Sequence, residues 1–178
     1  MLSIIVAKAK NNVIGKNDEL IMKLPAESKK FRELTEGKNV IMGRKTYDIL
    51  GKYLRERNVI VFSNNPDFRV STPNAKVVHS MLEIQQYIED KNENYVIGGA
   101  MIYRLLMQYV TKLYVTEVDK DFDGDAVFPR INEEVWKEEF FKADNTVTVH
   151  ITNLREKIEA DSKAPVYIKT IWGAGYKI

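Results

Sequence analysis

The chain of 178 residues contains no cysteine and only two histidines, His79 and His150, which lie far apart in the sequence. The absence of cysteine excludes disulfides, thiolate nucleophiles and cysteine-ligated zinc. Because two distant histidines do not have the spacing of metal ligands, we expect no metal site. A chain without disulfides suits a reducing compartment, and we therefore expect a cytoplasmic protein.

Long apolar runs and a strong charge of either sign are also absent. No apolar stretch approaches the length that spans a membrane, and residues 1–7 lack the basic flank and cleavage site of a signal peptide. We therefore expect no membrane partner. The formal net charge of +2 gives no reason by itself to expect nucleic-acid binding. The hydrophobic content of 44% is enough for a real core, and the length fits one domain with at most an appendage.

Short apolar segments alternate with segments of helical periodicity from residue 2 to residue 119. The apolar segments predict buried strands, at residues 2–7, 39–42, 58–63, 76–78, 94–97 and 112–119. Helices are expected between them, at residues 25–36, 44–50, 81–90 and 100–109. Ser80 and Glu83 have the spacing of a capping box. The alternation predicts a single-domain α/β fold, a mostly parallel mixed β-sheet flanked by helices, in which ligands bind beyond the carboxyl ends of the strands.

A carboxylate occupies an unusual position in the first expected helix. Pro25 suits a first helical turn, and on a period of 3.6 residues Leu24, Glu27, Phe31 and Leu34 fall on one face. Two interpretations of Glu27 stay open. It either reaches solvent from the first turn, near the positive end of the helix dipole, or lies in an apolar pocket where it can bind or protonate a ligand.

Two expected strand-to-helix turns have features of phosphate-binding turns. The first, Gly43–Thr46, carries two cationic side chains and a hydroxyl at the start of a helix. The second, Gly98–Ala100, consists of small residues that allow the backbone to approach a pyrophosphate closely. Each alone is more often only a tight turn, but together they suggest a dinucleotide lying across the sheet edge. Neither matches the G-x-G-x-x-G fingerprint or the ATP-type P-loop.

Four motifs occur in the order and at the spacing of a known family. They are Val40–Thr46, Val96–Tyr103, Leu113–Asp119 and Gly124–Pro129. Together with Val13–Gly15 and Leu24–Glu27, they resemble the successive signatures of bacterial dihydrofolate reductase over residues 1 to about 143. The resemblance implies NADPH-dependent reduction of 7,8-dihydrofolate to tetrahydrofolate. It also implies that antifolate inhibitors bind at the substrate site.

The resemblance implies roles for individual residues on the substrate side. Glu27 stands where the family has its active-site carboxylate and would bind the pterin, Thr116 would steady it, and Met22 lies where the family has a tryptophan beside the catalytic water. Arg57 follows a charged stretch and would by default be a solvated surface charge, but it matches the arginine that clamps the glutamate carboxylate. The implied substrate-binding residues are Ile5, Glu27, Phe31, Leu50, Leu54, Arg57 and Thr116.

On the cofactor side, the resemblance implies that Ala7 and Ile14 make backbone contacts to the nicotinamide carboxamide. Tyr103 would lie near the same ring, and the loop from Asn11 to Met22 would close over it as a mobile lid. The implied cofactor-binding residues are Ala7, Ile14, Gly15, Gly43, Arg44, Lys45, Thr46, Ser63, Asn64, Ile97, Gly98, Gly99, Ala100, Met101 and Tyr103.

The chain departs from the family at two places near the substrate. Ile21 and Met22 replace a usual Pro-Trp pair, and Glu27 replaces the aspartate that is common in bacterial members. The longer acid, with Ser28 beside it, reshapes the end of the pocket that receives a diaminopyrimidine. We therefore expect the protein to tolerate trimethoprim-like inhibitors better than ordinary bacterial reductases.

The last part of the chain resembles a different family. Residues Asn145–Ile158 and Tyr167–Ile178 resemble the recognition helix and wing that end an OmpR-like winged-helix response regulator. The helices that would pack beneath a recognition helix are missing, so we do not expect nucleic-acid binding. We accordingly divide the chain into a dihydrofolate reductase-like domain, residues 1–144, and a C-terminal extension, residues 145–178, that packs on or completes the sheet.

Two interpretations of this extension stay open. Val147, Val149 and Ile151 alternate as in a half-buried strand, whereas the resemblance favours a helix over residues 146–160 and a final strand from Val166, the interpretation that we prefer. Two functions also stay open. One is a reductase, expected to be a monomer. The other is a folate- and NADPH-binding module whose catalysis is impaired by the altered C-terminus and whose basic tail binds DNA weakly.

Overall fold

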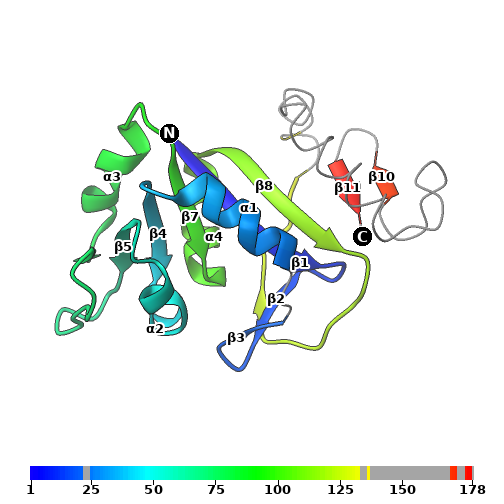
Figure 1. Cartoon of the computed structure of the whole chain (residues 1–178), viewed down its shortest axis with the longest axis horizontal. Coiled ribbons are helices and arrows are strands. Elements are labelled where there is room, and N and C mark those ends of the chain that lie inside the picture. Colours follow the sequence, from blue (N-terminus) through cyan, green and yellow to red (C-terminus); the bar gives the residue numbers. More distant parts are fainter. Residues whose placement is uncertain (22–24, 133–135, 137–168, 172–174, 178) are drawn as a thin grey trace.

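Figure 1 shows the computed structural model of the chain, of which we describe residues 1–21, 25–132, 136, 169–171 and 175–177. The side chains of residues 25–27, 169–171 and 175–177 are outside this description. In chain order the helices and strands are β1 (Leu2–Ala9), β2 (Val13–Lys16), β3 (Glu19–Leu20), α1 (Pro25–Thr35), β4 (Asn39–Gly43), α2 (Arg44–Leu50), η1 (Gly51–Tyr53), β5 (Asn58–Phe62), β6 (Ala75–Val78), α3 (Met81–Glu89), β7 (Asn94–Gly98), α4 (Ala100–Leu106), η2 (Met107–Tyr109), β8 (Val110–Val118), β9 (Ala126–Val127), β10 (Lys169–Ile171) and β11 (Gly175–Lys177).

Within the described residues, the main sheet has eight strands in the order β10-β11-β8-β1-β7-β4-β5-β6. All neighbouring pairs from β8 to β6 are parallel, and only the pair of β10 with β11 is antiparallel. Parallel neighbours require a crossover that covers a face of the sheet, which explains why helices separate these strands in the sequence. The expected α/β fold with a mostly parallel mixed sheet is therefore confirmed.

The core lies on both faces of the sheet, as the nearly continuous apolar strands predict. On one face, Leu2 and Ile4 of β1 pack in a cluster with Ile84 of α3 and Ile102 of α4. On the other face, Tyr47 of α2 belongs to a buried cluster, against which Ile5 of β1 and Phe31 and Leu34 of α1 pack. Helices α1 and α2 thus cover one face and α3 and α4 the other, and Figure 1 shows α1 crossing its face obliquely.

The segment from Asn11 to Met22, expected as a loop, contains a hairpin over its described part. Strands β2 and β3 pair antiparallel, with Lys16 opposite Glu19. The two residues between them, Asn17 and Asp18, have φ angles of 51° and 61°. Positive φ at both central residues is the geometry of a tight hairpin turn, for which Asn and Asp are among the better residues. Strand β9 extends this small sheet from the other side of β2.

The C-terminal extension contributes only two short strands to the described residues. Strand β10 falls inside the final strand expected from Val166, and β11 pairs with β8 where Lys177 lies opposite Glu117. The expected helix over residues 146–160 and the alternative strand at Val147–Ile151 lie outside the described residues. No helix in the described part is both long and apolar enough to cross a membrane.

Local signals in the sequence explain several helix ends. The Ser80 hydroxyl accepts a hydrogen bond from the backbone N–H of Glu83 at 3.3 Å and donates to the Glu83 carboxylate at 2.9 Å, which confirms the capping box. Gly37 follows α1 with a φ of 69°, the left-handed conformation that favours glycine after a helix.

Tyr47 connects α2 to the loop before β6. Its hydroxyl oxygen accepts the backbone N–H groups of Ser71 at 2.8 Å and Thr72 at 3.0 Å, and both side-chain hydroxyls lie within hydrogen-bonding distance. Burial alone would raise the pKa of Tyr47, but the hydrogen bonds from Ser71 and Thr72 lower it below its ordinary value. The tyrosine oxygen therefore holds the start of α2 against this loop.

We predict that Tyr47→Phe lowers the free energy of unfolding by about 1–3 kcal/mol, because two backbone N–H groups lose their acceptor. Urea unfolding of the variant and the parent measures this difference. Tyr53→Phe is the matched control, since Tyr53 is 68% exposed and should unfold like the parent. Equal effects of the two substitutions would contradict the role assigned to Tyr47.

Candidate active site

The two glycine turns lie next to each other at the carboxyl ends of β4 and β7. Met42 of β4 pairs with Gly98 of β7. The first turn begins at the next residue, Gly43, and the second begins at Gly98 itself. A Cβ atom at Gly99 would lie 3.3 Å from the Thr46 Oγ1, and one at Gly43 would lie 3.0 Å from the Ile102 Cγ1. Larger residues would therefore crowd the two turns, which together form a backbone cradle at the sheet edge.

Gly98 needs to be glycine for conformational reasons. Its φ is 127°, where a side chain is strongly disfavoured, and it is joined to Gly99 by a cis peptide bond. The buried Tyr103 hydroxyl lies beside it and donates a hydrogen bond to the Ile5 carbonyl oxygen at 2.8 Å. Burial raises the pKa of Tyr103, so the ring stays a neutral donor that ties α4 to β1.

The carboxyl ends of β1 and β8 bring a second group of expected site residues together. Ala7 lies opposite Thr116, and Ile5 lies opposite Tyr114. On the same face, Phe31 of α1 and Leu50 of α2 pack against the cluster that contains Leu54, which is only 3% exposed. An apolar wall therefore runs along the face covered by α1, toward the strand ends.

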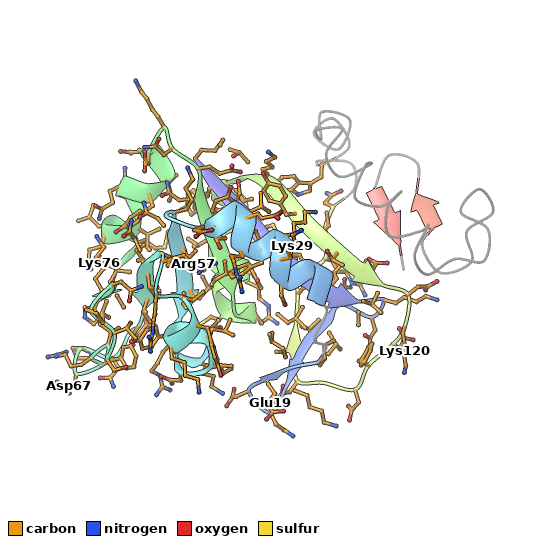
Figure 2. All side chains as sticks on the ribbon, in the orientation of Figure 1. Glu19, Lys29, Arg57, Asp67, Lys76 and Lys120 are labelled. Carbon is orange, nitrogen blue, oxygen red and sulfur yellow. The ribbon has the colours of Figure 1, made fainter. Side chains whose placement is uncertain are left out.

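Arg57 is buried in this apolar region, with only 7% of its surface exposed. Its Nε donates to the Thr35 Oγ1 at 2.9 Å, and its guanidinium carbon lies 5.5 Å from the centre of the Phe31 ring. Figure 2 shows Arg57 beside the carboxyl-terminal end of α1. The default interpretation of Arg57 as a solvated surface charge is therefore wrong.

The charge of Arg57 is incompletely compensated. Burial lowers the pKa of Arg57, while Glu36 and Glu56 act on it in the opposite direction. No carboxylate of the described residues lies within ion-pair distance of the guanidinium. A buried guanidinium bonded mainly to a neutral hydroxyl is costly unless an anion completes it. The site can thus accept a planar carboxylate, which a guanidinium binds through two parallel hydrogen bonds.

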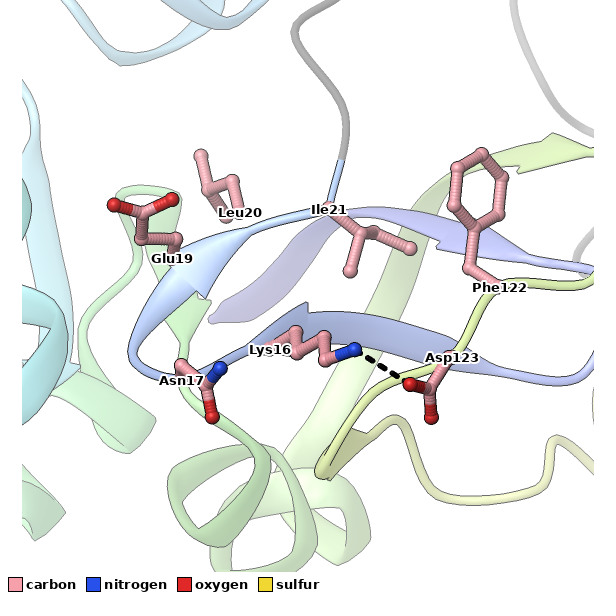
Figure 3. Close-up of a pocket in the computed structure, with 7 residues that line it drawn as sticks. All are labelled: Lys16, Asn17, Glu19, Leu20, Ile21, Phe122 and Asp123. Carbon is pink, nitrogen blue, oxygen red and sulfur yellow. Dashed lines mark hydrogen bonds and ion pairs between the residues drawn. The ribbon is translucent and has the colours of Figure 1, made fainter.

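The hairpin of β2 and β3 is attached to its surroundings by polar contacts. At its turn, Lys45 of α2 donates to Asp18 at 2.9 Å, and beside the turn Lys16 pairs with Asp123 at 2.5 Å. Between the hairpin and the loop after β8 lies a cavity of about 470 Å³, drawn in Figure 3. Its walls are formed by Lys16, Asn17, Glu19, Leu20, Ile21, Phe122 and Asp123. None of these residues is an expected site residue, so we place the site at the strand ends and not in this cavity.

The remaining expected residues are distributed around the same edge. Ile14 and Gly15 are buried in β2, Ile97 is buried in β7, and Ala100 begins α4. Arg44, Asn64 and Met101 are exposed, whereas Ser63 is buried at the end of β5. Met22 and the side chain of Glu27 lie outside the described residues, although the backbone of Glu27 belongs to the first turn of α1.

The sequence analysis missed His79, which directly follows β6. Its ring Nδ1 lies 2.7 Å from the carbonyl oxygen of Ser63, one of the expected cofactor residues. The sequence does place His79 directly after the apolar segment that predicts β6, and therefore at the carboxyl end of a strand, where ligands bind in this class of fold.

Fold and site together define an α/β protein whose two glycine turns lie at the carboxyl ends of a parallel sheet, the place where proteins of this class bind ligands. Comparisons with known proteins specify the class further. A family model described as dihydrofolate reductase matches residues 1–155. The chain is 36% identical over 137 residues to dihydrofolate reductase of Bacillus subtilis, an alignment that spans 77% of this chain and 80% of the relative. The corresponding enzyme of Haemophilus influenzae is 38% identical over 140 residues, or 78% of this chain and 84% of that protein.

A solved structure is similar as well. Dihydrofolate reductase from Enterococcus faecalis, complexed with NADP(H) and RAB-propyl, superposes with a TM-score of 0.68 at 34% identity, covering 75% of this chain and 80% of that one. The chain therefore belongs to the dihydrofolate reductase family, and the resemblance inferred from the four motifs is confirmed. The division at residue 144 stays a prediction.

Proposed function

We propose that the chain reduces 7,8-dihydrofolate to tetrahydrofolate with NADPH. Apart from family membership, the main support for this function is Arg57, whose guanidinium is buried and has no carboxylate partner among the described residues. It lies on the face of the sheet where the apolar wall leads toward the two glycine turns. A substrate with a flat ring at one end and a carboxylate at the other fits this arrangement.

The residues of the cofactor side fit NADPH. The glycines at positions 43, 98 and 99 leave their backbone groups accessible to a pyrophosphate, and Lys45, Thr46 and Ser63 surround the adjoining strand ends. When bound, NADPH supplies the hydride. The backbones of Ala7 and Ile14 are expected to hold the carboxamide of its nicotinamide ring.

On the substrate side, the apolar side chains Ile5, Phe31, Leu50 and Leu54 are expected to pack on the pterin and benzoyl rings. Arg57 would bind the glutamate carboxylate through its two terminal nitrogens, since its Nε already donates to Thr35. Thr116, opposite Ala7 in the sheet, lies on the strand that would face the pterin end and would steady Glu27.

Reduction of the N5=C6 bond requires a hydride at C6 and a proton at N5. Glu27, in the first turn of α1, is the residue assigned to binding the 2-amino group and N3 of the pterin and to favouring protonation of N5, through a water molecule. An apolar surrounding strengthens this interaction because it excludes competing solvent. In the sequence, Met22 stands where the family has a tryptophan.

We predict that Glu27→Gln lowers kcat/KM for dihydrofolate by about 100-fold or more near neutral pH, since it removes the ionisable group but keeps the side-chain shape. The loss should shrink as the pH falls, because dihydrofolate then takes its proton from solvent. Spectrophotometric NADPH oxidation measures both effects, and Glu27→Asp is the control that keeps the carboxylate and most of the activity.

Two results would contradict this assignment. Unchanged activity of Glu27→Gln across the pH range would remove Glu27 from proton transfer. A parent chain that binds NADPH and dihydrofolate without turning them over would support the alternative of a binding module.

Trimethoprim tolerance is a separate proposal that depends on the length of the acid at position 27. We expect an inhibition constant of about 1 µM or weaker for the parent, because a longer acid displaces the diaminopyrimidine from its best position. Glu27→Asp should tighten inhibition by about tenfold or more. A nanomolar inhibition constant for the parent would exclude tolerance. The cytoplasmic location and the monomeric state stay predictions.

A further inference from the structure

Asp123 and Gly124 form the only Asp-Gly pair of the sequence, which contains no Asn-Gly pair either. Both residues lie in the loop between β8 and β9, outside any helix or strand. An aspartate followed by glycine is the sequence in which a side-chain carboxyl group reaches the next backbone nitrogen most easily. Glycine has no Cβ to shield that nitrogen, and its backbone adopts the conformations that ring closure requires.

The loop is fixed on both sides of this pair and unconstrained within it. Before the pair, the Asn11 side-chain amide donates to the Phe122 carbonyl oxygen at 2.8 Å. After the pair, the Asp125 N–H donates to the Gly15 carbonyl oxygen at 3.2 Å. Within the part of the chain that the structure describes, the Gly124 N–H donates to no backbone carbonyl. No backbone hydrogen bond of that kind therefore has to break before the Gly124 nitrogen can react.

The Asp123 side chain lies in solvent and close to this nitrogen. It is 86% exposed, and its carboxylate pairs with the Lys16 amine at 2.5 Å, as Figure 3 shows. The hydrogen bond and charge of Lys16, with a smaller contribution from the backbone N–H of Gly124, hold the pKa of Asp123 below its ordinary value. The carboxylate thus already contacts the group that would attack it. The pair with Lys16 opposes the attack, because an ionised carboxylate is a poor acyl group.

We propose that Asp123 converts spontaneously to isoaspartate in the folded protein, and that this change detaches the hairpin of β2 and β3 from the loop after β8. The Gly124 nitrogen attacks Cγ of the protonated Asp123 carboxyl group, an N–Cγ bond forms, and one water molecule leaves. This closure is intramolecular, since the two groups belong to adjacent residues. Water then hydrolyses the five-membered succinimide ring. Cleavage of the N–Cγ bond restores aspartate, whereas cleavage at the former backbone carbonyl leaves the main chain running through the side chain.

The product does not fit the contacts that Gly124 makes with β2. Isoaspartate places one additional carbon in the main chain immediately before Gly124. A Cβ atom at Gly124 would lie 2.3 Å from the Val13 Cγ1 and 2.5 Å from the Gly15 carbonyl oxygen, so the lengthened backbone has to move away from β2. Two bonds would then break, one from the Asp125 N–H to Gly15 and one from the Asn17 N–H to the Asp125 carboxylate at 3.3 Å.

Peptide mapping of the folded protein during prolonged incubation tests the first step. Isoaspartate leaves the mass of a peptide unchanged but alters its retention and its fragmentation by electron transfer, so mass spectrometry measures it at each aspartate. We expect it to accumulate at Asp123 and not at Asp67, which is also exposed but precedes a phenylalanine. Asp123→Glu is the matched variant. It keeps a carboxylate for Lys16, but it should form no such product, because glutamate would have to close a six-membered ring.

Two further measurements test the role of Lys16 and the effect on the hairpin. Lys16→Gln should accelerate isoaspartate formation by about two- to fivefold, as the free energy of an exposed ion pair allows. Hydrogen exchange reports local opening. The N–H groups of Asn17 and Asp125 should exchange faster in the aged parent, and not in Asp123→Glu that has been aged for the same time.

Three results would overturn the proposal. The first is isoaspartate that forms at Asp123 only in urea-unfolded protein, or no faster than at Asp67. The second is unchanged exchange at Asn17 and Asp125 in protein that has largely converted. The third is an equal rate in Lys16→Gln, which would remove the protection assigned to Lys16. None of these measurements uses NADPH or substrate, so their outcome is independent of the proposed function.

Discussion

The proposed site depends on the buried guanidinium of Arg57, which forms no ion pair with a carboxylate of the described residues. A guanidinium that is 7% exposed, bonded to the Thr35 hydroxyl and set against the Phe31 ring, has given up most of its hydration without gaining a carboxylate. In the proposed site, a ligand carboxylate bound to the guanidinium would offset this desolvation cost. The position of α1 depends on the same contact, because Phe31 and Thr35 belong to this helix.

The register of the parallel sheet determines what else the ligand meets. Strand pairing places Gly43, Phe62 and Val78 in one row and brings Gly98 beside Met42, although these residues are far apart in the sequence. Parallel strands have all their carboxyl ends at the same edge, so turns from separate crossovers converge there. The proposed cofactor turns thus share one edge with Ala7 and Thr116, near the carboxyl ends of β1 and β8. Arg57 instead directly precedes β5, at the amino end of that strand, so a substrate bound as proposed would extend from this edge across the covered face of the sheet.

The sequence predicted the strands well because the central ones, β1, β4, β5 and β7, are short apolar runs that are largely buried. It predicted the glycine turns because they directly follow β4 and β7. It did not predict the hairpin of β2 and β3, because it treated residues 11–22 as a loop, whereas Asn17 and Asp18 form a tight turn with positive φ angles. The charged neighbours Arg55 and Glu56 made a solvated side chain the default interpretation of Arg57, and only the family resemblance assigned it to the substrate side. The burial of Arg57 arises from α1, whose Thr35 is distant in the sequence. Likewise, only strand register brings His79 to Ser63. The expectations for Met22, the Glu27 side chain and residues 146–160 fall outside the described residues.

The most direct test of the account compares two substrates on one variant. Arg57→Leu removes the buried charge, and 7,8-dihydropteroate is dihydrofolate without its glutamate. The account predicts that the variant loses about 10- to 100-fold in kcat/KM for dihydrofolate, as expected for a charged hydrogen bond, while its kcat/KM for dihydropteroate stays that of the parent. An equal loss on both substrates, or no loss on either, would contradict the claim that this guanidinium anchors the ligand.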